Sequence, residues 1–422
     1  MSTEETSAAL SDLVDALRRD KRRGPYAGHD AYVHTAWAVQ EQATRLIESR
    51  SAVSAVPELR KAVDRITKAL MHLDDSSGMA GDALRALVDC YARALAAAPP
   101  KNPAPLARWI AATTLDGPGW PDLPLAAFAP ALGPKGLAAL TDIVEERARF
   151  LTPADQYGAE FGVRHLRVQL AEVSGDTDHY IAVLAEQLTS PTPYVKIVRA
   201  LRAADRPDEA VTWAERGLTD HPTSPNQYAG PLRDELVALH LAADRPEKAL
   251  LVRRDAFART PVHDLFRPLA ATANSLDHPE AIDWALDLLR ERLDTNPTTY
   301  TRELIECLRE TGRTDDAWHT ATHLDALSKY TLQDLIEKRR TTHPADVIAP
   351  YHHLVDLYLA DTGNKRRYDY TARHLKKLRT VHRTLGTEPD FDAYLTTLRA
   401  EHRRKPSFIT RLDQSGLRGT AP

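Results

Sequence analysis

Apolar residues recur along the first part of the chain at the three- and four-residue spacing of amphipathic helices. Val63, Ile66, Leu70 and Leu73 follow one another at intervals of three, four and three positions, so they share one helix face. Pro57 precedes this stripe and fits the first turn of a helix, where the missing amide hydrogen of proline costs nothing. The pattern predicts a helix that begins near Pro57 and ends before the glycines of DDSSGMAGD.

A second regular stripe follows that glycine-containing segment. Its apolar positions are Leu84, Leu87, Val88, Tyr91 and Leu95. Asp82 is placed to cap this helix by accepting from the free amides of its first turn. Asp74 and Asp75 lie between the two helices, where turn and capping roles are favoured over acid–base catalysis. Further helical patterns cover residues 106–112 and 137–150.

The second half of the chain repeats its helix breaks. ADRPDEA begins at Ala204 and ADRPEKA begins at Ala243. Related breaks cover residues 174–180, 276–281, 311–317 and 362–368. The last residues of successive breaks are 30, 39, 32, 36 and 51 positions apart. All but the last of these intervals bracket the period of about 34 residues that is typical of tetratricopeptide (TPR) repeats.

The residue types of these breaks suit a turn between two helices. Aspartate, glycine or asparagine takes the chain out of the first helix, and Pro207 or Pro246 fits the first turn of the second. Pro222 and Pro261 each lie twelve residues beyond the alanine that closes a break, where they end the second helix. A single helix pair would expose an apolar face, so we expect neighbouring pairs to stack into a superhelix with a concave surface.

Composition agrees with a helical fold. The 422 residues include only 18 Gly, 7 Phe and 3 Met, whereas Ala, Leu, Arg, Asp and Glu are abundant. We therefore expect an all-α protein, an α-solenoid of TPR-like helix pairs with an N-terminal helical subdomain. The expected domains are that subdomain (1–150), the TPR-like repeats (151–345) and a C-terminal helical cap with a basic tail (346–422).

Charge is unevenly distributed along the chain. The formal net charge is −4, so the chain as a whole has no electrostatic attraction to nucleic acid or anionic membranes. Between Lys365 and Arg418, however, fourteen Lys or Arg residues are set against six Asp or Glu residues.

Cys90 and Cys307 lie within helical patterns and suit a reducing compartment. The chain opens without a signal-peptide pattern and has no apolar run of about 18 residues, so we expect a cytoplasmic protein with no membrane partner.

No motif in the sequence specifies a reaction. GxxxxGK[ST], GxGxxG after a strand and GxSxG are all absent, and we expect no cofactor. His319 and His323 are four residues apart on a predicted helix, which can direct two imidazoles toward one zinc ion. Asp315, Asp316 or Asp325 would have to complete such a site, and the HExxH pattern is missing. Two surface histidines are therefore favoured over a metal site.

The basic region near the end of the chain offers a more specific candidate. In the predicted helix NKRRYDYTARHLKKLRTVHR, Tyr368, Tyr370 and His374 are interleaved with cations, and EHRRKPSF follows as a second basic cluster. The candidate contacts with nucleic acid are Lys376, Lys377, Arg403 and Arg404. A solvated helix pair that caps the solenoid is nevertheless favoured over contact with nucleic acid or an acidic partner.

The same region carries a family resemblance. The segment from Tyr351 to Leu417, with its GN-x-x-x-Y turn, FDAYL helix and LRAEHRRK tail, resembles the end of bacterial, largely actinobacterial, SWIM zinc-finger proteins. VDRITKALMHLDDSSGMAGDALRALVDCYARA and VRALRAADRPDEAVTWAERGL are similar to the same family, so the resemblance covers about residues 25–417. It implies a helical-repeat body. In that family a zinc finger with CxC and CxH ligands precedes the body and is thought to bind nucleic acid or protein, but this sequence contains neither motif.

These observations support three hypotheses of different kinds. The first is a non-catalytic scaffold that binds a protein or peptide partner in the concave groove of residues 180–345. Its candidate contacts are Trp213, Tyr228, Arg253 and Trp318. The second is a nucleic-acid-associated protein that acts through the basic C-terminal helices. The third is an enzyme whose pocket is built across repeats, which the lack of a reactive motif disfavours but leaves open.

Overall fold

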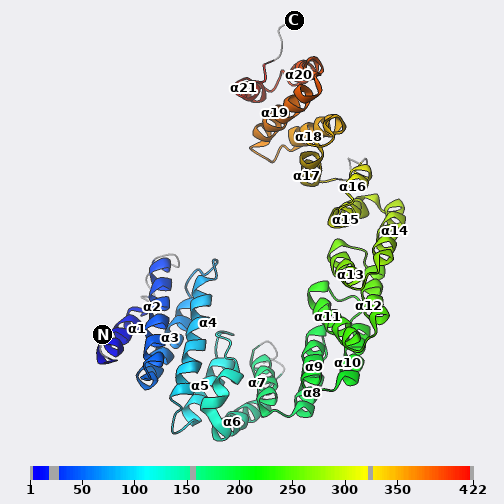
Figure 1. Ribbon diagram of the computed structural model, residues 1–422. Coiled ribbons are helices and arrows are strands. Elements are labelled where there is room, and N and C mark those ends of the chain that lie inside the picture. Colours follow the sequence, from blue (N-terminus) through cyan, green and yellow to red (C-terminus); the bar gives the residue numbers. More distant parts are fainter. Residues whose placement is uncertain (1–2, 19–27, 153–157, 322–326, 419–422) are drawn as a thin grey trace. The chain divides into compact units, whose positions relative to one another are not determined.

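The computed structural model describes residues 3–18, 28–152, 158–321 and 327–418, and every regular element within these ranges is helical (Figure 1). The chain divides into two compact units, Met1–Gly217 (unit 1) and Leu218–Pro422 (unit 2), with the boundary inside α10 (Pro207–Asp220). The predicted fold class is confirmed: the protein is an all-α solenoid of TPR-like helix pairs with an N-terminal helical subdomain. Among the described helices, none is both long enough and apolar enough to span a membrane.

Most of unit 1 is a helical subdomain built around one apolar core. Its helices are α1 (Thr3–Ala16), α2 (His29–Glu48), α3 (Ala52–Leu70), α4 (Met79–Ala97), α5 (Ala104–Leu115), α6 (Leu125–Arg149) and α7 (Ala159–Ser174). Helix α4 packs against α2, α3 and α6, and α6 packs against α5 and α7. In this core the ring of Tyr91 forms T-shaped contacts with Trp109 and Phe128, with 5.3 and 5.9 Å between ring centroids. The Trp109 indole donates to Asp64 at 2.9 Å, so its one polar atom is satisfied.

The start of α3 corrects the prediction for Pro57. The helix begins at Ala52, and Pro57 lies inside it rather than in its first turn. A proline there leaves the carbonyl four residues earlier without its donor. That carbonyl belongs to Val53, which is 74% exposed, so water can replace the missing bond.

The cap of α4 and the extent of α6 also differ from prediction. Asp75, not Asp82, caps α4: its carboxylate accepts from the amides of Ala80 at 2.9 Å and Gly81 at 2.8 Å. This confirms the capping role favoured for Asp75. Helix α6 begins at Leu125, well before the predicted pattern of residues 137–150, and is broken at Gly133 by a φ of 56°.

The remaining helices form successive pairs. Helices α8 (Thr177–Ala185) and α9 (Pro191–Ala203) lie in unit 1. Unit 2 contains α11 (Asn226–Ala242), α12 (Pro246–Arg259), α13 (His263–Ser275), α14 (Pro279–Thr295), α15 (Pro297–Glu310), α16 (Thr314–Thr320), α17 (Lys329–Arg339), the 3-10 helix η3 (Pro344–Val347), α18 (Ile348–Ala360), α19 (Arg367–Leu385), α20 (Glu388–Glu401) and α21 (Pro406–Gln414). From α11 to α16 each helix packs against the next, while α12 also contacts α14 and α13 contacts α15. Such contacts between neighbours are those of stacked helix pairs.

The repeated breaks form one kind of turn. Asp205, Asp244 and Asp277 have left-handed φ values of 56°, 56° and 59°, and Gly312 has a φ of 74° at the equivalent position. In each turn the amide of the following residue donates to the carbonyl five residues before it, as Arg245 does to His240 at 2.9 Å. This bond defines the Schellman motif, whose left-handed position suits glycine and tolerates a short polar residue. The geometry explains why ADRP recurs in the sequence.

The cation after the left-handed residue connects neighbouring repeats. Arg206 lies 2.6 Å from Asp178 on α8, and Arg313 pairs with Asp283 on α14. In both cases the acidic partner precedes the arginine by about one repeat length, on the second helix of the preceding pair. The turn therefore ends one helix and also fixes its contact with the previous repeat.

Candidate nucleic-acid interface

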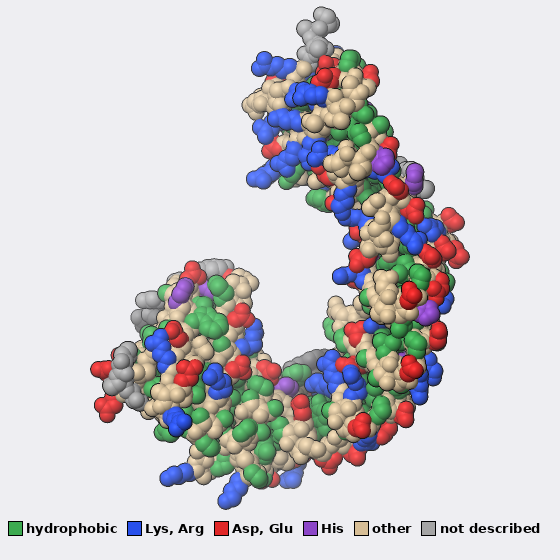
Figure 2. Space-filling view, viewed as in Figure 1, with side chains coloured by type: hydrophobic (Ala, Val, Ile, Leu, Met, Phe, Trp, Pro, Cys, Tyr) green, Lys and Arg blue, Asp and Glu red, His purple; other side chains and the backbone are tan. Residues whose placement is uncertain are grey.

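A cationic cavity lies between α19 and α21 near the end of unit 2. Its volume is about 610 Å³. The lining side chains that define it, called the basic groove below, are Arg366, Asp369, Tyr370, Arg373, Lys376 and Arg411. Figure 2 shows Lys and Arg side chains gathered over the helices at this end of unit 2. The groove therefore gives the local excess of positive charge a defined place in the fold.

Helical spacing brings most of these residues together. Tyr370, Arg373 and Lys376 follow one another at intervals of three on one face of α19, and the N-cap residue Arg366 continues that row four positions before Tyr370. Arg411 comes from α21, which lies more than thirty positions further along the chain. The groove therefore combines one helix face with a side chain that only tertiary packing can place there.

Hydrogen bonds fix α21 and the end of the chain against the neighbouring helices. Arg379 of α19 donates to the carbonyl of Gly416 at 3.0 Å, and Arg399 of α20 donates to the carbonyl of Leu417 at 3.0 Å. Arg399 also lies 2.8 Å from Asp413. These contacts satisfy carbonyls just beyond α21 and hold the wall of the groove that carries Arg411.

Three of the four groove cations carry charge that no carboxylate among the described residues neutralises. Arg411 lies 2.7 Å from Asp369 and forms an ion pair with it. Within the described part of the chain, Arg366, Arg373 and Lys376 have no carboxylate within ion-pair distance. The Arg373 guanidinium lies 5.4 Å from the centre of the Tyr370 ring, a cation–π distance. A surface with this charge and an aromatic side chain is suited to phosphates and bases.

The structure places the four predicted nucleic-acid contacts in three different settings. Lys376 is exposed and lines the basic groove. Lys377 points elsewhere, and its Nζ lies 2.6 Å from Glu337 on α17. Arg403 and Arg404 are exposed in the turn before α21, outside the lining of the groove.

The aromatic residues predicted to alternate with the cations also lie in different environments. Tyr370 lines the groove, but Tyr368 packs on Phe408, with 5.2 Å between ring centroids. His374 is only 1% exposed, so the expectation that it belongs to the basic surface is wrong. Its burial lowers its pKa to about 4. The apolar side of α19 packs against α18. His374 lies on that side because it is four residues before the buried Leu378.

Sequence reasoning missed Arg366, Arg373 and Arg411 as groove residues. The first two could have been found, because they share the spacing of Lys376 on one helix face. Arg411 could not, since nothing in the sequence indicates that α21 folds back along α19.

The contacts predicted for the concave groove of the repeats differ in exposure. Tyr228 on α11 is 49% exposed. Arg253 is buried, pairs with Asp234 at 2.7 Å and reaches toward Thr272 on α13. It therefore connects three successive helices.

Both tryptophans predicted to line the groove are half-buried. Trp213 lies against Tyr194, with 6.0 Å between ring centroids, and Trp318 lies 5.6 Å from the Arg339 guanidinium. Of the four predicted groove contacts, Tyr228 alone is exposed.

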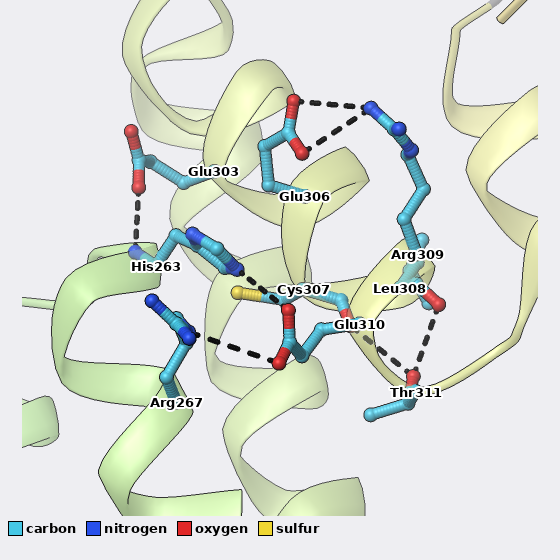
Figure 3. A network of polar contacts seen from close by, with 9 residues as sticks. All are labelled: His263, Arg267, Glu303, Glu306, Cys307, Leu308, Arg309, Glu310 and Thr311. Carbon is cyan, nitrogen blue, oxygen red and sulfur yellow. Dashed lines mark hydrogen bonds and ion pairs between the residues drawn. The ribbon is translucent and has the colours of Figure 1, made fainter.

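A polar network connects α13 and α15 (Figure 3). Glu303 accepts from the backbone amide of His263 at 2.6 Å, and Glu310 lies 3.5 Å from the imidazole of the same residue. Cys307 lies on the same helix, where burial and neighbouring carboxylates raise the pKa of its thiol. A protonated thiol is a poor nucleophile, so these contacts join two repeats and do not activate Cys307.

The described residues include one of the two histidines predicted as metal ligands and a second cavity with charged side chains. His319 is exposed on α16, and His323 lies outside the described residues. Within those residues no three His, Cys, Asp or Glu side chains are placed to hold a metal ion.

A second cavity of about 480 Å³, between α6, α7 and α8, contains Glu145 and Arg167. Arg167 donates to that carboxylate at 2.8 and 2.6 Å and lowers its pKa, which moves it further from the neutral range in which a general acid or base is most effective.

Comparison with known proteins identifies the family. The chain belongs to the family of unknown function DUF6880, whose model matches residues 38–411. No curated protein matches the chain. The relationship to SWIM zinc-finger proteins stays a prediction.

Several solved structures of helical proteins align over most of the chain. The human IFIT1 dimer with PPP-AAAA is 12% identical, over 91% of this chain and 92% of that one, with a TM-score of 0.23. The Cut9-Hcn1 hetero-tetramer of the APC/C is 14% identical, over 91% and 76%, with a TM-score of 0.20. A circular tandem repeat protein is 12% identical, over 98% and 99%, with a TM-score of 0.19. Likeness at this level does not extend to function.

Proposed function

We propose that this protein is a non-catalytic helical-repeat protein that binds nucleic acid through the basic groove. One observation carries the proposal: Arg366, Arg373 and Lys376 line a single cavity and have no carboxylate partner among the described residues. Like charges held together repel one another, and a polyanion relieves that repulsion. The proposal thus reverses the preference for a simple capping role that the sequence alone suggested.

Nucleic acid fits this site because its phosphates repeat along a chain. Each phosphate that a cation neutralises releases condensed counterions, which favours binding at low salt. The resemblance to SWIM proteins is compatible with this function. A cytoplasmic location, the three-domain division and the lack of a cofactor are further parts of the proposal.

The test is an anisotropy titration of a labelled oligonucleotide of about 16 nucleotides, at salt concentrations between about 50 and 200 mM. The wild-type affinity should fall steeply with salt. Arg366→Gln, Arg373→Gln and Lys376→Gln should each reduce the slope by about one. Lys248→Gln, at an exposed position on α12, is the matched control and should leave the slope unchanged. The groove triple variant combines Arg366→Gln, Arg373→Gln and Lys376→Gln. The proposal would be contradicted if the wild-type protein did not bind at low salt, or if the groove triple variant bound as tightly as wild type.

A second candidate function is binding of a protein or peptide partner along the first helices of the repeats in unit 2. The observation in its favour is the 49% exposure of Tyr228 on α11, since an exposed tyrosine is a common anchor in protein interfaces. The test is co-purification from nuclease-treated lysate with wild-type protein and with Tyr228→Ala. A partner that survives nuclease and is lost only from the Tyr228 variant would support this function, and a partner retained by that variant would argue against it.

A further inference from the structure

A row of aromatic and cationic side chains leads from the basic groove to α17. Arg373, in the groove, lies over Tyr370, whose ring stacks with Tyr358 of α18 at 5.4 Å between centroids. The Nζ of Lys329 lies 5.2 Å from the Tyr358 ring and 5.4 Å from the ring of Tyr330. The row therefore crosses three successive helices, α19, α18 and α17, and connects Tyr330 to the groove by short contacts.

The members of this row differ in what they can still bind. Tyr358 is 3% exposed and donates its hydroxyl hydrogen to Gln333, so its ring is part of the core. Lys329 forms an ion pair with Asp361, which neutralises its charge. Tyr330 is 69% exposed, so much of its ring surface is open to solvent. It is the one member of the row with a largely open aromatic surface.

We propose that the ligand of the basic groove is a single-stranded nucleic acid, with its phosphates at Arg366, Arg373 and Lys376 and a base stacked on Tyr330. This inference rests on the proposed function and specifies its ligand. In a duplex the bases are paired and stacked on one another, so only a single strand can offer a base face to an exposed ring. Stacking does not read the base type, because every base has a π face, and the site has no sequence preference.

The position of Tyr330 distinguishes it from other exposed apolar side chains of unit 2. Tyr228, Leu241 and Leu251 are also exposed, but they lie on α11 and α12 and belong to no contact row that reaches the groove. Leu251 is therefore a control for loss of an exposed apolar side chain, since it is 54% exposed and lies outside both proposed binding sites. Tyr330→Phe is a second control, because it keeps the ring and removes only the hydroxyl.

The experiment measures binding of the full chain to one labelled sequence in single-stranded and in duplex form, with DNA and RNA versions of the strand. The single strand should bind more tightly than the duplex. Tyr330→Ala should weaken single-strand binding about five- to hundredfold and leave its salt dependence unchanged. Duplex binding should not change, and Tyr330→Phe and Leu251→Ala should both bind like wild type. The DNA and RNA arms show which strand is preferred.

The outcomes separate this inference from the proposed function. Equal affinity for strand and duplex, or an unchanged affinity in Tyr330→Ala, overturns the inference while binding through the basic groove stands. Binding that is lost in the groove triple variant but unchanged in Tyr330→Ala has the same meaning. Failure of the wild-type protein to bind any nucleic acid overturns both. Melting curves of all variants verify that the fold is retained.

Discussion

Arg411 of α21 lies 2.7 Å from Asp369 of α19, and this ion pair spans the basic groove. Asp369 is the acidic residue in the lining, so it neutralises one of four cations there. Asp369→Asn removes the negative charge while keeping the size of the side chain. Affinity for a labelled oligonucleotide should then rise about fivefold, because the freed Arg411 charge is worth roughly 1 kcal/mol beside a phosphate in water. Anisotropy titrations of variant and wild type would measure the change.

The same variant has an internal control. Asp390 is exposed on α20 and does not line the groove, so Asp390→Asn, which also removes one negative charge, should leave affinity unchanged. If Asp369→Asn lowers affinity, the ion pair serves to position α21, and the simple electrostatic account of the groove is wrong.

Substitution of two adjacent lysines should affect two different properties, oligonucleotide binding and stability. Lys376 lines the groove, whereas Lys377 donates to Glu337 at 2.6 Å. Burial by itself would raise the pKa of Glu337, but Lys377 and its neighbours outweigh burial and keep that pKa below its usual value. Lys376→Gln should weaken oligonucleotide binding and leave the free energy of unfolding unchanged. Lys377→Gln should lower that free energy by about 1 kcal/mol and leave binding unchanged.

Oligonucleotide titrations and urea denaturation of both variants would measure the two effects. A loss of affinity in Lys377→Gln equal to that in Lys376→Gln would show that the charge of the whole helix, and not the groove, attracts the ligand.

The left-handed turn residues make a prediction about stability. Asp244 has a φ of 56° between α11 and α12, which costs any residue other than glycine roughly 1 kcal/mol. Asp244→Gly should therefore be neutral or stabilising, whereas Asp244→Val should lower the free energy of unfolding by about 1–2 kcal/mol. Asp255→Gly, at an exposed position inside α12, should cost about 0.5–1 kcal/mol instead. Urea denaturation would compare the three variants, and equal effects of glycine at both positions would contradict the role of the turn.

Sequence patterns predicted the solenoid because its determinants are local. The residues of ADRP specify a left-handed position and a helix start, and both depend on contacts within about one turn of helix. Prediction failed where tertiary packing decides. Arg411 reaches the groove only because α21 packs on α19. The charge of the C-terminal region was visible in the sequence, but whether each cation was free or paired, as Lys377 is with Glu337, depended on the fold.

A buried histidine predicts how stability depends on pH. His374 packs between the rings of Tyr358 and Tyr351, at centroid distances of 5.0 and 6.4 Å, and its burial lowers its pKa from 6.5 to about 4. Between these two values the unfolded chain binds a proton that the folded chain does not. The contribution of His374 is therefore fully present above pH 6.5 and is lost as the pH falls toward 4, by about 2 kcal/mol between pH 7.5 and pH 5.

His374→Phe removes the titrating group and should reduce the loss of unfolding free energy between pH 7.5 and pH 5 by that amount. Burial also lowers the pKa of His352 and His402, so part of the pH dependence of unit 2 should remain in the variant. His319→Gln, at an exposed position on α16, should keep the wild-type dependence. Urea denaturation at the two pH values measures these differences directly. If His374→Phe loses as much stability on acidification as wild type, then the folded and unfolded chains bind the proton of His374 equally well. Burial between α18 and α19 would then not disfavour the charged imidazole.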